Sequence, residues 1–233
     1  MISIALLVPV CSRNQNYKNF NETAFIKIFY NSFLNTYNPE YQYTIYIGID
    51  ITDSFYIENF NKFSELDNEK IRVCAVVLRE CENNPVSAWN KLFEISYSNH
   101  DYFYQLADDT KMIHPWAQKF IKILLKRNNI GIVGGCDYIN YYKRMISYKE
   151  PIIKNAFFHK NHYKIFGTLF NKKIKNRFAY DWITEIYKPN FYTLCIDIKI
   201  ENKVYGRYLD SLTSNILKKL IEKDKKHLLS RIL

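Results

Sequence analysis

The sequence predicts an α/β fold in which a mainly parallel central sheet is flanked by helices. Two observations carry this prediction. Strand-like and helix-like segments alternate through the first 135 residues, as they do in chains built from β-α units. The first segment is also a continuous apolar run, which is typical of a parallel strand covered on both faces. No repeat and no Gly/Pro-rich linker divides the 233 residues, so we expect a single domain.

The first elements follow from the hydrophobic periodicity, taken in order along the chain. Residues 2–10 form an apolar run that predicts a buried strand. The run lacks the basic flank of a signal peptide and is too short to span a bilayer. Residues 20–36 carry apolar side chains at helical spacing, with Asn21 or Thr23 as the expected cap. Residues 43–49 then predict a second strand.

The alternation continues with a third strand at residues 71–78 and a helix at residues 85–98, which opens at a proline. Residues 102–107 predict a fourth strand, residues 115–127 a helix, and residues 130–135 a fifth strand closed by glycines. The periodicity weakens beyond this strand. We expect the second half of the chain to pack onto the sheet and to supply part of a substrate site.

The C-terminal segment, residues 211–233, is amphipathic. Its apolar side chains Ile216, Leu217, Leu220 and Ile221 fall on one helical face, with lysines opposite. Packing against the rest of the domain is the expected use of such a face. A peripheral contact with a membrane is the alternative.

Composition restricts the class of partner and the compartment. The formal net charge of +10 favours anionic partners such as nucleotides, nucleic acid or a membrane surface. The signatures of nucleic-acid-binding modules are absent, so no nucleic-acid partner is expected. The five cysteines are odd in number and form no C-x-x-C pair, which argues against a disulfide framework and a structural zinc site. A reducing, cytoplasmic location is therefore expected.

Two adjacent carboxylates, Asp108 and Asp109, end the aromatic fourth strand. Two desolvated carboxylates repel each other unless a proton or a cation neutralises one of them. Carboxylate oxygens suit Mg²⁺ or Mn²⁺, and such an ion keeps open positions for the oxygens of a diphosphate. The pair therefore predicts a metal site. The alternative is a solvated turn, since aspartate is also common in turns.

The other strand exits are polar as well. Residues 9–14 follow the first strand, Asp50 ends the second, and Arg79 and Glu80 follow the third. Open parallel sheets bind ligands at the carboxyl ends of their strands. These exits together predict a site for a nucleotide held partly through a metal. The phosphate loops GxxxxGK[ST] and GxGxxG are absent, which disfavours the two common nucleotide sites that depend on them.

Several of these motifs, in this order, resemble a family 2-like glycosyltransferase of the GT-A fold. The first strand ends in PVCSRN, the second ends at Asp50, and NPVSAWNKLFEIS leads into YFYQLADDT. The later block Phe157–Tyr187 resembles the acceptor half of short glycosyltransferases from giant DNA viruses. The resemblance covers about residues 1–190. It implies a Rossmann-like fold with a nucleotide-sugar half at residues 1–135 and an acceptor half at residues 136–233.

The resemblance also implies an activity, the transfer of a sugar from a nucleotide-sugar donor to an acceptor hydroxyl on a glycan, a protein or a small molecule. Mn²⁺ or Mg²⁺ would be held by Asp109 as the principal ligand and by Asp108, which contacts metal or ribose. Asp181 would be the general base, and a single base without a nucleophile favours inversion. The residues expected at the nucleotide sugar are Pro9, Val10, Ser12, Arg13, Asp50, Asn90 and Asp108.

The sequence departs from the family pattern at two positions. Ala107 stands where the D-x-D motif has its first carboxylate, and Tyr180 precedes Asp181 where an acidic pair is common. His159 and His162 are candidates for a further metal ligand, or they are ordinary hydrogen-bonding histidines. The alternative for Asp181 is a helix N-cap.

Two other functions fit parts of the same pattern. A nucleotidyltransferase uses a similar sheet and metal, but it prefers a Gly-rich basic loop where this chain has residues 11–14. A basic protein that binds nucleic acid or a membrane surface would carry the carboxylates incidentally, and its binding would be sensitive to salt. The resemblance to viral enzymes implies a location in the host cytoplasm.

Overall fold

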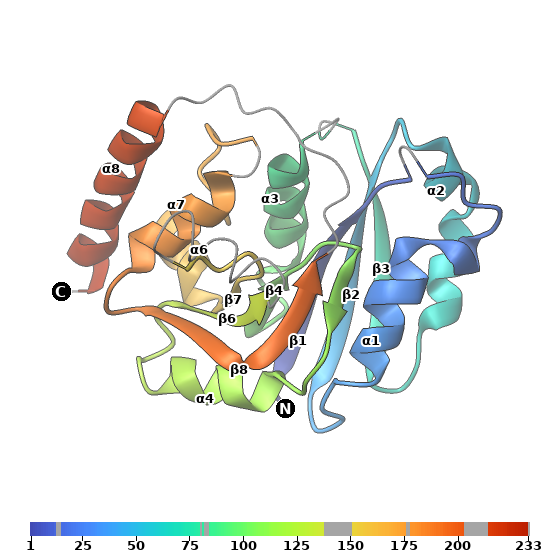
Figure 1. Ribbon diagram of the computed structural model, residues 1–233, viewed down its shortest axis with the longest axis horizontal. Helices are drawn as coiled ribbons and strands as arrows, with labels where there is room; N and C mark the ends of the chain where they lie inside the picture. Colours follow the sequence, from blue (N-terminus) through green and yellow to red (C-terminus); the bar gives the residue numbers. More distant parts are fainter. Residues whose placement is uncertain are drawn as a thin grey trace.

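The computed structural model describes residues 1–12, 15–79, 81, 84–137, 151–175, 178–202 and 214–232. The strands within these ranges are β1 (Ser3–Val10), β2 (Gln42–Asp50), β3 (Ile71–Leu78), β4 (Tyr102–Gln105), β5 (Thr110–Met112), β6 (Ile132–Asp137), β7 (Phe157–His159) and β8 (Tyr192–Asn202). They form one sheet in the order β3-β2-β1-β4-β7-β6-β8-β5. Figure 1 shows this sheet with the helices around it. Arg13, which was predicted to contact the nucleotide sugar, lies outside the described ranges. So do Asn14 and Glu80, at the exits of the first and third strands.

The sheet is mixed. Strands β3, β2, β1 and β4 run parallel to one another, and β6 runs parallel to β8. The short strand β7 is antiparallel to both β4 and β6, and β5 is antiparallel to β8. The prediction of a mainly parallel sheet therefore holds for the first half and is wrong for the second. Parallel pairing requires a long crossover, whereas β7 reverses direction and enters between β4 and β6.

Helices cover both faces of the sheet. The first face carries η1 (Phe20–Glu22), η2 (Phe25–Tyr30), α1 (Asn31–Leu34), α2 (Ser54–Glu58), η3 (Phe60–Leu66) and α4 (Ala117–Leu125). The second face carries α3 (Pro85–Ser96), α6 (Asn161–Phe166), α7 (Phe178–Tyr187) and α8 (Ser214–Ile232).

Strand β1 separates the two hydrophobic cores. Because side chains alternate along a strand, Ile4 and Leu6 enter the core beneath the first set of helices. Ala5 and Leu7 enter the core beneath the second set. All four side chains are fully buried, which confirms the prediction of a central strand covered on both faces.

Most elements of the first half were predicted at the right place. The helical segment after residue 20 is built from η1, η2 and α1 instead of one regular helix. Its cap is Thr23, whose hydroxyl accepts a hydrogen bond from the backbone N–H of Ile26 at 3.3 Å. All five cysteines lie within the described ranges, and none of them is in a disulfide.

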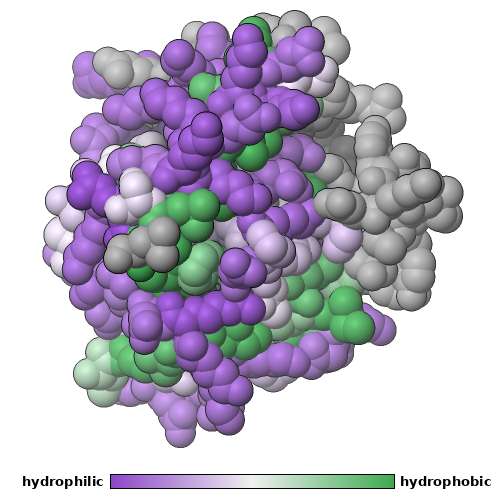
Figure 2. Space-filling model, turned by 90° about the vertical axis from the view of Figure 1, so that its left-hand side faces the viewer, coloured by the Kyte–Doolittle hydropathy of each residue, from purple (hydrophilic) through white to green (hydrophobic). Residues whose placement is uncertain are grey.

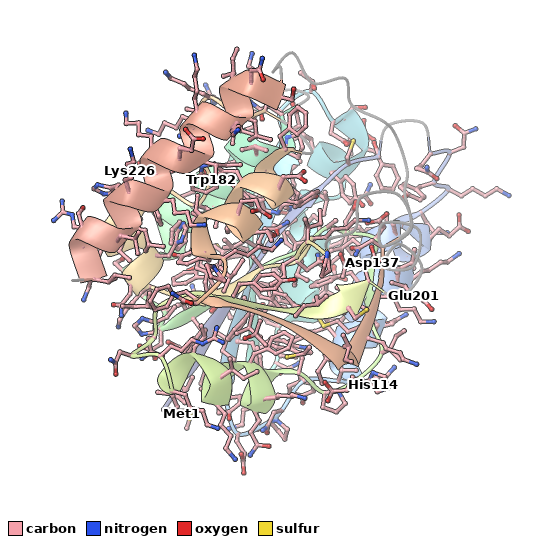
Figure 3. The ribbon with its side chains drawn as sticks, turned by 60° about the vertical axis from the view of Figure 1, so that its left-hand side comes forward. Met1, His114, Asp137, Trp182, Glu201 and Lys226 are labelled. Carbon is pink, nitrogen blue, oxygen red and sulfur yellow. The ribbon has the colours of Figure 1, made fainter. Side chains whose placement is uncertain are left out.

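The C-terminal helix α8 packs on the domain, as its apolar face predicted. Leu217, Leu220 and Leu228 are buried against α6 and α7, whereas Ile216 is 47% exposed and lies off this face. Figure 3 shows Trp182 of α7 on the inner side of α8. The indole N–H of Trp182 donates to Asp224 of α8 at 2.9 Å. Hydrophilic residues cover most of the surface on this side, with separate hydrophobic patches (Figure 2). No helix among the described residues is long and apolar enough to cross a membrane.

Candidate active site at the carboxyl edge of the sheet

The carboxyl ends of β1, β2, β3 and β4 meet at one edge, because these four strands are parallel neighbours. The acidic pair follows β4 there, beside the chain that leaves β1. The backbone N–H of Cys11 donates to the carboxylate of Asp108 at 3.2 Å. This hydrogen bond joins the exits of the first and fourth strands, whose meeting at one edge the sequence predicted.

Asp53 joins the exits of the first and second strands, and sequence reasoning missed it. Its side chain is only 4% exposed. Its two oxygens accept from the backbone N–H and the hydroxyl of Ser12, each at 2.7 Å. It also caps α2 by accepting from the N–H of Tyr56 at 3.2 Å. The signal was present, since an aspartate directly before an apolar helical run is a common cap.

The other predicted pocket residues of these two exits lie at the same edge. Pro9 and Val10 are the last residues of β1, and Asp50 is the last residue of β2. The half-buried carboxylate of Asp50 accepts from the N–H and hydroxyl of Thr52, at 3.0 and 2.8 Å. These contacts fix a local turn at the exit of β2.

Burial makes Asp108 difficult to ionise. The loss of solvent and the neighbouring charge of Asp109 raise the pKa of the Asp108 carboxyl to about 7, against an ordinary value of 3.8. The N–H of Cys11 acts in the opposite direction, and Asp53 adds to the increase. At neutral pH the pair therefore attracts a proton or a cation.

The acidic pair fits a divalent cation of the hard type. Asp108 and Asp109 offer carboxylate oxygens, and the raised pKa of Asp108 indicates a charge that a metal would neutralise. Within the described ranges no group of three or more His, Cys, Asp or Glu side chains gathers around one point. Water and the oxygens of a bound ligand would complete the coordination of an ion held by two carboxylates.

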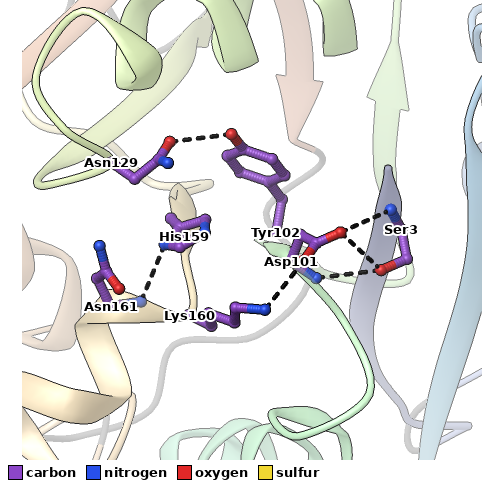
Figure 4. Close-up of polar contacts among 7 residues, drawn as sticks. All are labelled: Ser3, Asp101, Tyr102, Asn129, His159, Lys160 and Asn161. Carbon is purple, nitrogen blue, oxygen red and sulfur yellow. Dashed lines mark hydrogen bonds and ion pairs between the residues drawn. The ribbon is translucent and has the colours of Figure 1, made fainter. Parts of the chain in front are cut away.

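The predicted histidine ligands lie elsewhere. His159 pairs with Tyr102 at the beginning of β4, whereas Asp108 lies beyond the other end of this strand. Figure 4 shows His159 in a polar cluster at this opposite edge, where its Nδ1 accepts from the N–H of Asn161 at 3.2 Å. Burial lowers the pKa of His159 to about 4. The structure does not bring this residue to the acidic pair.

His162 is 2% exposed and belongs to the core beneath α6 and α7. Its two ring nitrogens lie 2.7 Å from the hydroxyl of Tyr187 and 2.9 Å from the carbonyl oxygen of Leu169. Burial lowers its pKa to about 4. Both nitrogens are thus used within the protein, which agrees with the reading of an ordinary hydrogen-bonding histidine.

A buried polar network supports the acidic turn from below. The hydroxyl of Thr110 accepts from the N–H of Ala107 at 3.1 Å and donates to the side-chain oxygen of Asn202 at 2.8 Å. The amide of Asn202 donates to Asn155 at 2.9 Å and to Asp137 at 3.2 Å. Because these bonds bracket the turn, they fix the position of both carboxylates relative to the sheet.

The network ends at the carboxyl edge in an ion pair. Asp137, the last residue of β6, is 8% exposed and accepts from the ammonium group of Lys154 at 2.9 Å. It lies beside the end of β8, near Glu201 (Figure 3). Sequence reasoning ended this strand at the glycines and missed Asp137. The rule that pointed to Asp50 and Asp108, an acidic residue at a strand exit, would have found it.

Two residues of α3 connect the acidic edge with the second half of the chain. The indole N–H of Trp89 donates to the carbonyl of Leu106 at 2.9 Å, and its ring lies 6.0 Å from the ring of Tyr180. Asp181 follows in the first turn of α7 and is half-buried. The described helix already begins at Phe178, so Asp181 lies inside the helix and not at its cap.

Asn90 was expected at the nucleotide sugar, and the structure gives its amide other partners. The side-chain oxygen accepts from the N–H of Phe170 at 2.7 Å, and the side-chain nitrogen donates to the carbonyl of Phe170 at 3.0 Å. This pair of bonds ties α3 to the segment before α7. Asn90 therefore fixes the backbone of Phe170 relative to α3.

No family model and no curated protein matches the sequence. Solved structures of S. aureus TarS have a similar fold. TarS 1-349 in complex with UDP-GlcNAc superposes with a TM-score of 0.63 at 11% identity, over 96% of this chain and 66% of that one. The complex with UDP gives 0.61 at 10% identity, over 97% and 65%. A longer TarS structure gives 0.58 at 11% identity, over 88% and 37%.

The chain thus spans about two thirds of the shorter TarS structures and 37% of the longer one. At identities of 10 to 11% the likeness shows the fold alone. It confirms, at that level, the Rossmann-like fold that the family resemblance implied. Together with the mixed sheet and its two helical layers, it establishes this chain as an α/β protein with the fold of TarS.

Proposed function

We propose that the chain is a glycosyltransferase that transfers a sugar from a nucleotide-sugar donor to an acceptor hydroxyl with the help of a divalent metal. The observation that carries this proposal is the joining of three strand exits, through the bond from Cys11 to Asp108 and the bonds from Ser12 to Asp53. Parallel sheets bind ligands at this edge. The likeness to TarS, whose structures include complexes with UDP and UDP-GlcNAc, supports a nucleotide sugar as the ligand.

The proposed donor site lies between the exits of β1 and β2. Pro9, Val10 and Ser12 would line one side and Asp50 the other, with Asp53 holding the two loops together. Asp109 and Asp108 would hold Mn²⁺ or Mg²⁺, which neutralises the negative charge of a nucleoside-diphosphate leaving group. Arg13 belongs to this proposal by sequence and lies outside the described residues.

Asp181 is the proposed general base. Its carboxylate would take the proton of the acceptor hydroxyl, whose oxygen then forms a bond to the anomeric carbon while the bond to the diphosphate breaks. One base acting on the acceptor gives inversion at that carbon. The contact of Trp89 with Leu106 and Tyr180 supports this role, because it links the acidic edge to the turn that carries Asp181.

The test of donor binding is thermal unfolding with UDP and Mn²⁺. We expect UDP with Mn²⁺ to raise the melting temperature of the wild type and to leave that of Asp109→Ala unchanged. Asp197→Ala is the matched control, since Asp197 is an exposed carboxylate on β8 paired with Lys119. If neither UDP nor any other nucleoside diphosphate shifts the wild type, the proposal fails.

The test of the base is sugar transfer by Asp181→Asn. We expect this variant to keep the UDP-dependent shift and to lose transfer from a nucleotide sugar. Transfer at the wild-type rate would remove Asp181 from the mechanism. Nucleotidyl transfer in place of sugar transfer would favour the second enzyme class.

The non-enzymatic alternative makes a different prediction. A basic binding protein would bind nucleic acid or anionic lipid in a salt-sensitive manner that Asp109→Ala does not weaken. The peripheral membrane contact of α8 and the relation to viral enzymes stay predictions from the sequence.

A further inference from the structure

An open groove of about 660 Å³ runs along the exposed side of α3. Its first wall is the end of β3 with Arg79, and its second wall is the segment from Tyr163 to Ile174. Helix α3 follows β3, so its first turn lies at the carboxyl edge of the sheet and the helix runs back from that edge. The groove therefore begins beside the proposed donor site. Its volume lies in the range of small-molecule sites, about 300–1,000 Å³.

The lining of the groove is rich in hydrogen-bonding groups of both kinds. Arg79 and Lys172 offer donors, and Lys91 and Glu94 form an ion pair with each other at 3.0 Å. The hydroxyl of Thr168 donates to the carbonyl of Phe170 at 3.2 Å and can still accept. Three cations against one carboxylate give the lining a net positive charge. Apolar residues share the lining, among them Val77 and Ile95, which are 38% and 39% exposed.

An aromatic ring completes the lining. Tyr163 is stacked on Tyr97 with the ring centroids 3.7 Å apart and the planes at 11°. It also meets Phe93 of α3 edge-on at 5.6 Å. These contacts hold the ring in one orientation in the wall of the groove. A fixed aromatic ring gives an apolar surface that suits the C–H face of a sugar ring.

The second wall of the groove is bonded to α3 and packs on α7. Asn90 bonds both backbone groups of Phe170, as described above. The ring of Phe170 packs on Trp89 at 5.9 Å and on Trp182 of α7 at 6.4 Å. A ligand in the groove would thus touch the same segment that positions α7 and Asp181.

We propose that this groove binds an oligosaccharide and is the acceptor subsite of the enzyme. The claim that the groove binds a sugar rests on its lining alone. The claim that this sugar is the acceptor rests on the proposed function. Sugar hydroxyls both donate and accept, which matches the mixture of Arg79, Lys172 and Thr168. A lipid tail would leave the charged side chains of the lining without hydrogen bonds, and the nucleotide already has its proposed site between the exits of β1 and β2. The net positive charge predicts that glycans with acidic groups bind more tightly than neutral ones of the same length.

The experiment is binding of the full chain to an array of immobilised oligosaccharides, neutral and acidic, of two to eight residues. We expect a defined set of glycans to bind the wild type. The dissociation constant of the best of these should rise at least tenfold in Arg79→Ala and in Lys172→Ala. Both side chains are exposed, so the fold should tolerate their loss. Lys122→Ala is the control, because Lys122 is an exposed cation on α4, at the other face of the sheet.

Three outcomes overturn the inference. In the first, the wild type binds no glycan of the array. In the second, both groove variants keep the affinity of the wild type for the best glycan. In the third, the wild type binds extended peptides in place of glycans, and the same variants lose that binding. The UDP-dependent thermal shift separates this test from that of the proposed function. Groove variants should keep that shift. A wild type that binds glycans but no nucleoside diphosphate would leave the groove intact and refute the glycosyltransferase.

Discussion

Replacing Asp108 by asparagine should stabilise the protein at pH 8 in the absence of metal. Asparagine keeps an oxygen that can accept from the N–H of Cys11, and it removes the charge that lies beside Asp109. The pKa of Asp108 is raised from 3.8 to about 7, and each unit corresponds to about 1.4 kcal/mol. The upper limit of the gain is therefore about 4 kcal/mol. Because the side chain is half-buried, solvent screening reduces our expectation to about 2 kcal/mol.

The pH dependence fixes the sign. A carboxyl whose pKa is raised on folding contributes stability that is complete below pH 3.8 and is lost as the pH rises to about 7. Asparagine does not titrate. The advantage of Asp108→Asn should therefore be small at pH 4, grow up to pH 7 and stay constant above it.

The assay is thermal unfolding of both proteins from pH 4 to pH 8 in a chelating buffer. For a chain of this length about 2 kcal/mol corresponds to roughly 4–8 °C in melting temperature. A variant that melts at or below the wild type at pH 8 would refute the reasoning. An advantage of equal size at pH 4 and pH 8 would do the same, because it could not come from the titration of Asp108. Mn²⁺ added in excess at pH 8 should reduce the difference, because the wild type keeps both carboxylates and is stabilised more than the variant.

Asp101→Asn is the matched control of opposite sign. Burial acts to raise the pKa of Asp101, but hydrogen bonds from Lys160 and Ser3 outweigh it, and the pKa is lowered (Figure 4). Such a carboxylate contributes stability above its ordinary pKa that is lost as the pH falls. Asp101→Asn should therefore be less stable than the wild type at pH 8, and the difference should shrink in acid.

Three further substitutions test the supports of the site. Thr110→Val removes the acceptor for the N–H of Ala107, so it should lower the free energy of unfolding by about 1–3 kcal/mol and weaken Mn²⁺ binding. Thr110→Ser keeps the hydroxyl and should restore both properties. An equal loss in the two variants would contradict a role of the hydroxyl. Asp53→Ala removes both acceptors for Ser12 and so releases the loop after β1. The dissociation constant of UDP, measured by calorimetry, should rise at least tenfold. An unchanged affinity would show that this loop does not touch the nucleotide. Asp224→Ala removes the acceptor that Trp182 of α7 and Asn171 use on α8, so limited proteolysis should release α8 sooner. An unchanged digestion rate would show that the buried leucines of α8 hold this helix without Asp224.

The strands of the first half could be predicted from the sequence because their signal is local. Residues 71–78 form β3 as predicted, and the runs assigned to β1 and β2 shift by one residue at most. A continuous apolar run between polar exits is sufficient to identify a buried parallel strand. The strand β7, three residues long within an aromatic stretch, carries no such pattern and escaped prediction.

The polar supports of the site escaped prediction for a related reason. Thr110, Asn155 and Asn202 lie 45 to 92 positions apart and are ordinary residues in the sequence. They become a network only because β5 pairs with β8 and residue 155 lies next to β7. Asn90 is similar, since its partner Phe170 is 80 residues away.

The sequence by itself determined the parallel first half of the sheet, the edge at which its strands end and the acidic pair at that edge. These follow from periods of two and 3.6 residues and from the exits of consecutive strands, which neighbouring residues encode. The tertiary structure decided the rest: that β7 and β5 make the sheet mixed, that His159 and His162 lie away from the acidic pair, and that Asp53 and Thr110 hold the neighbouring loops. Such contacts join positions far apart in the chain, so only the packing of the two hydrophobic cores brings them together.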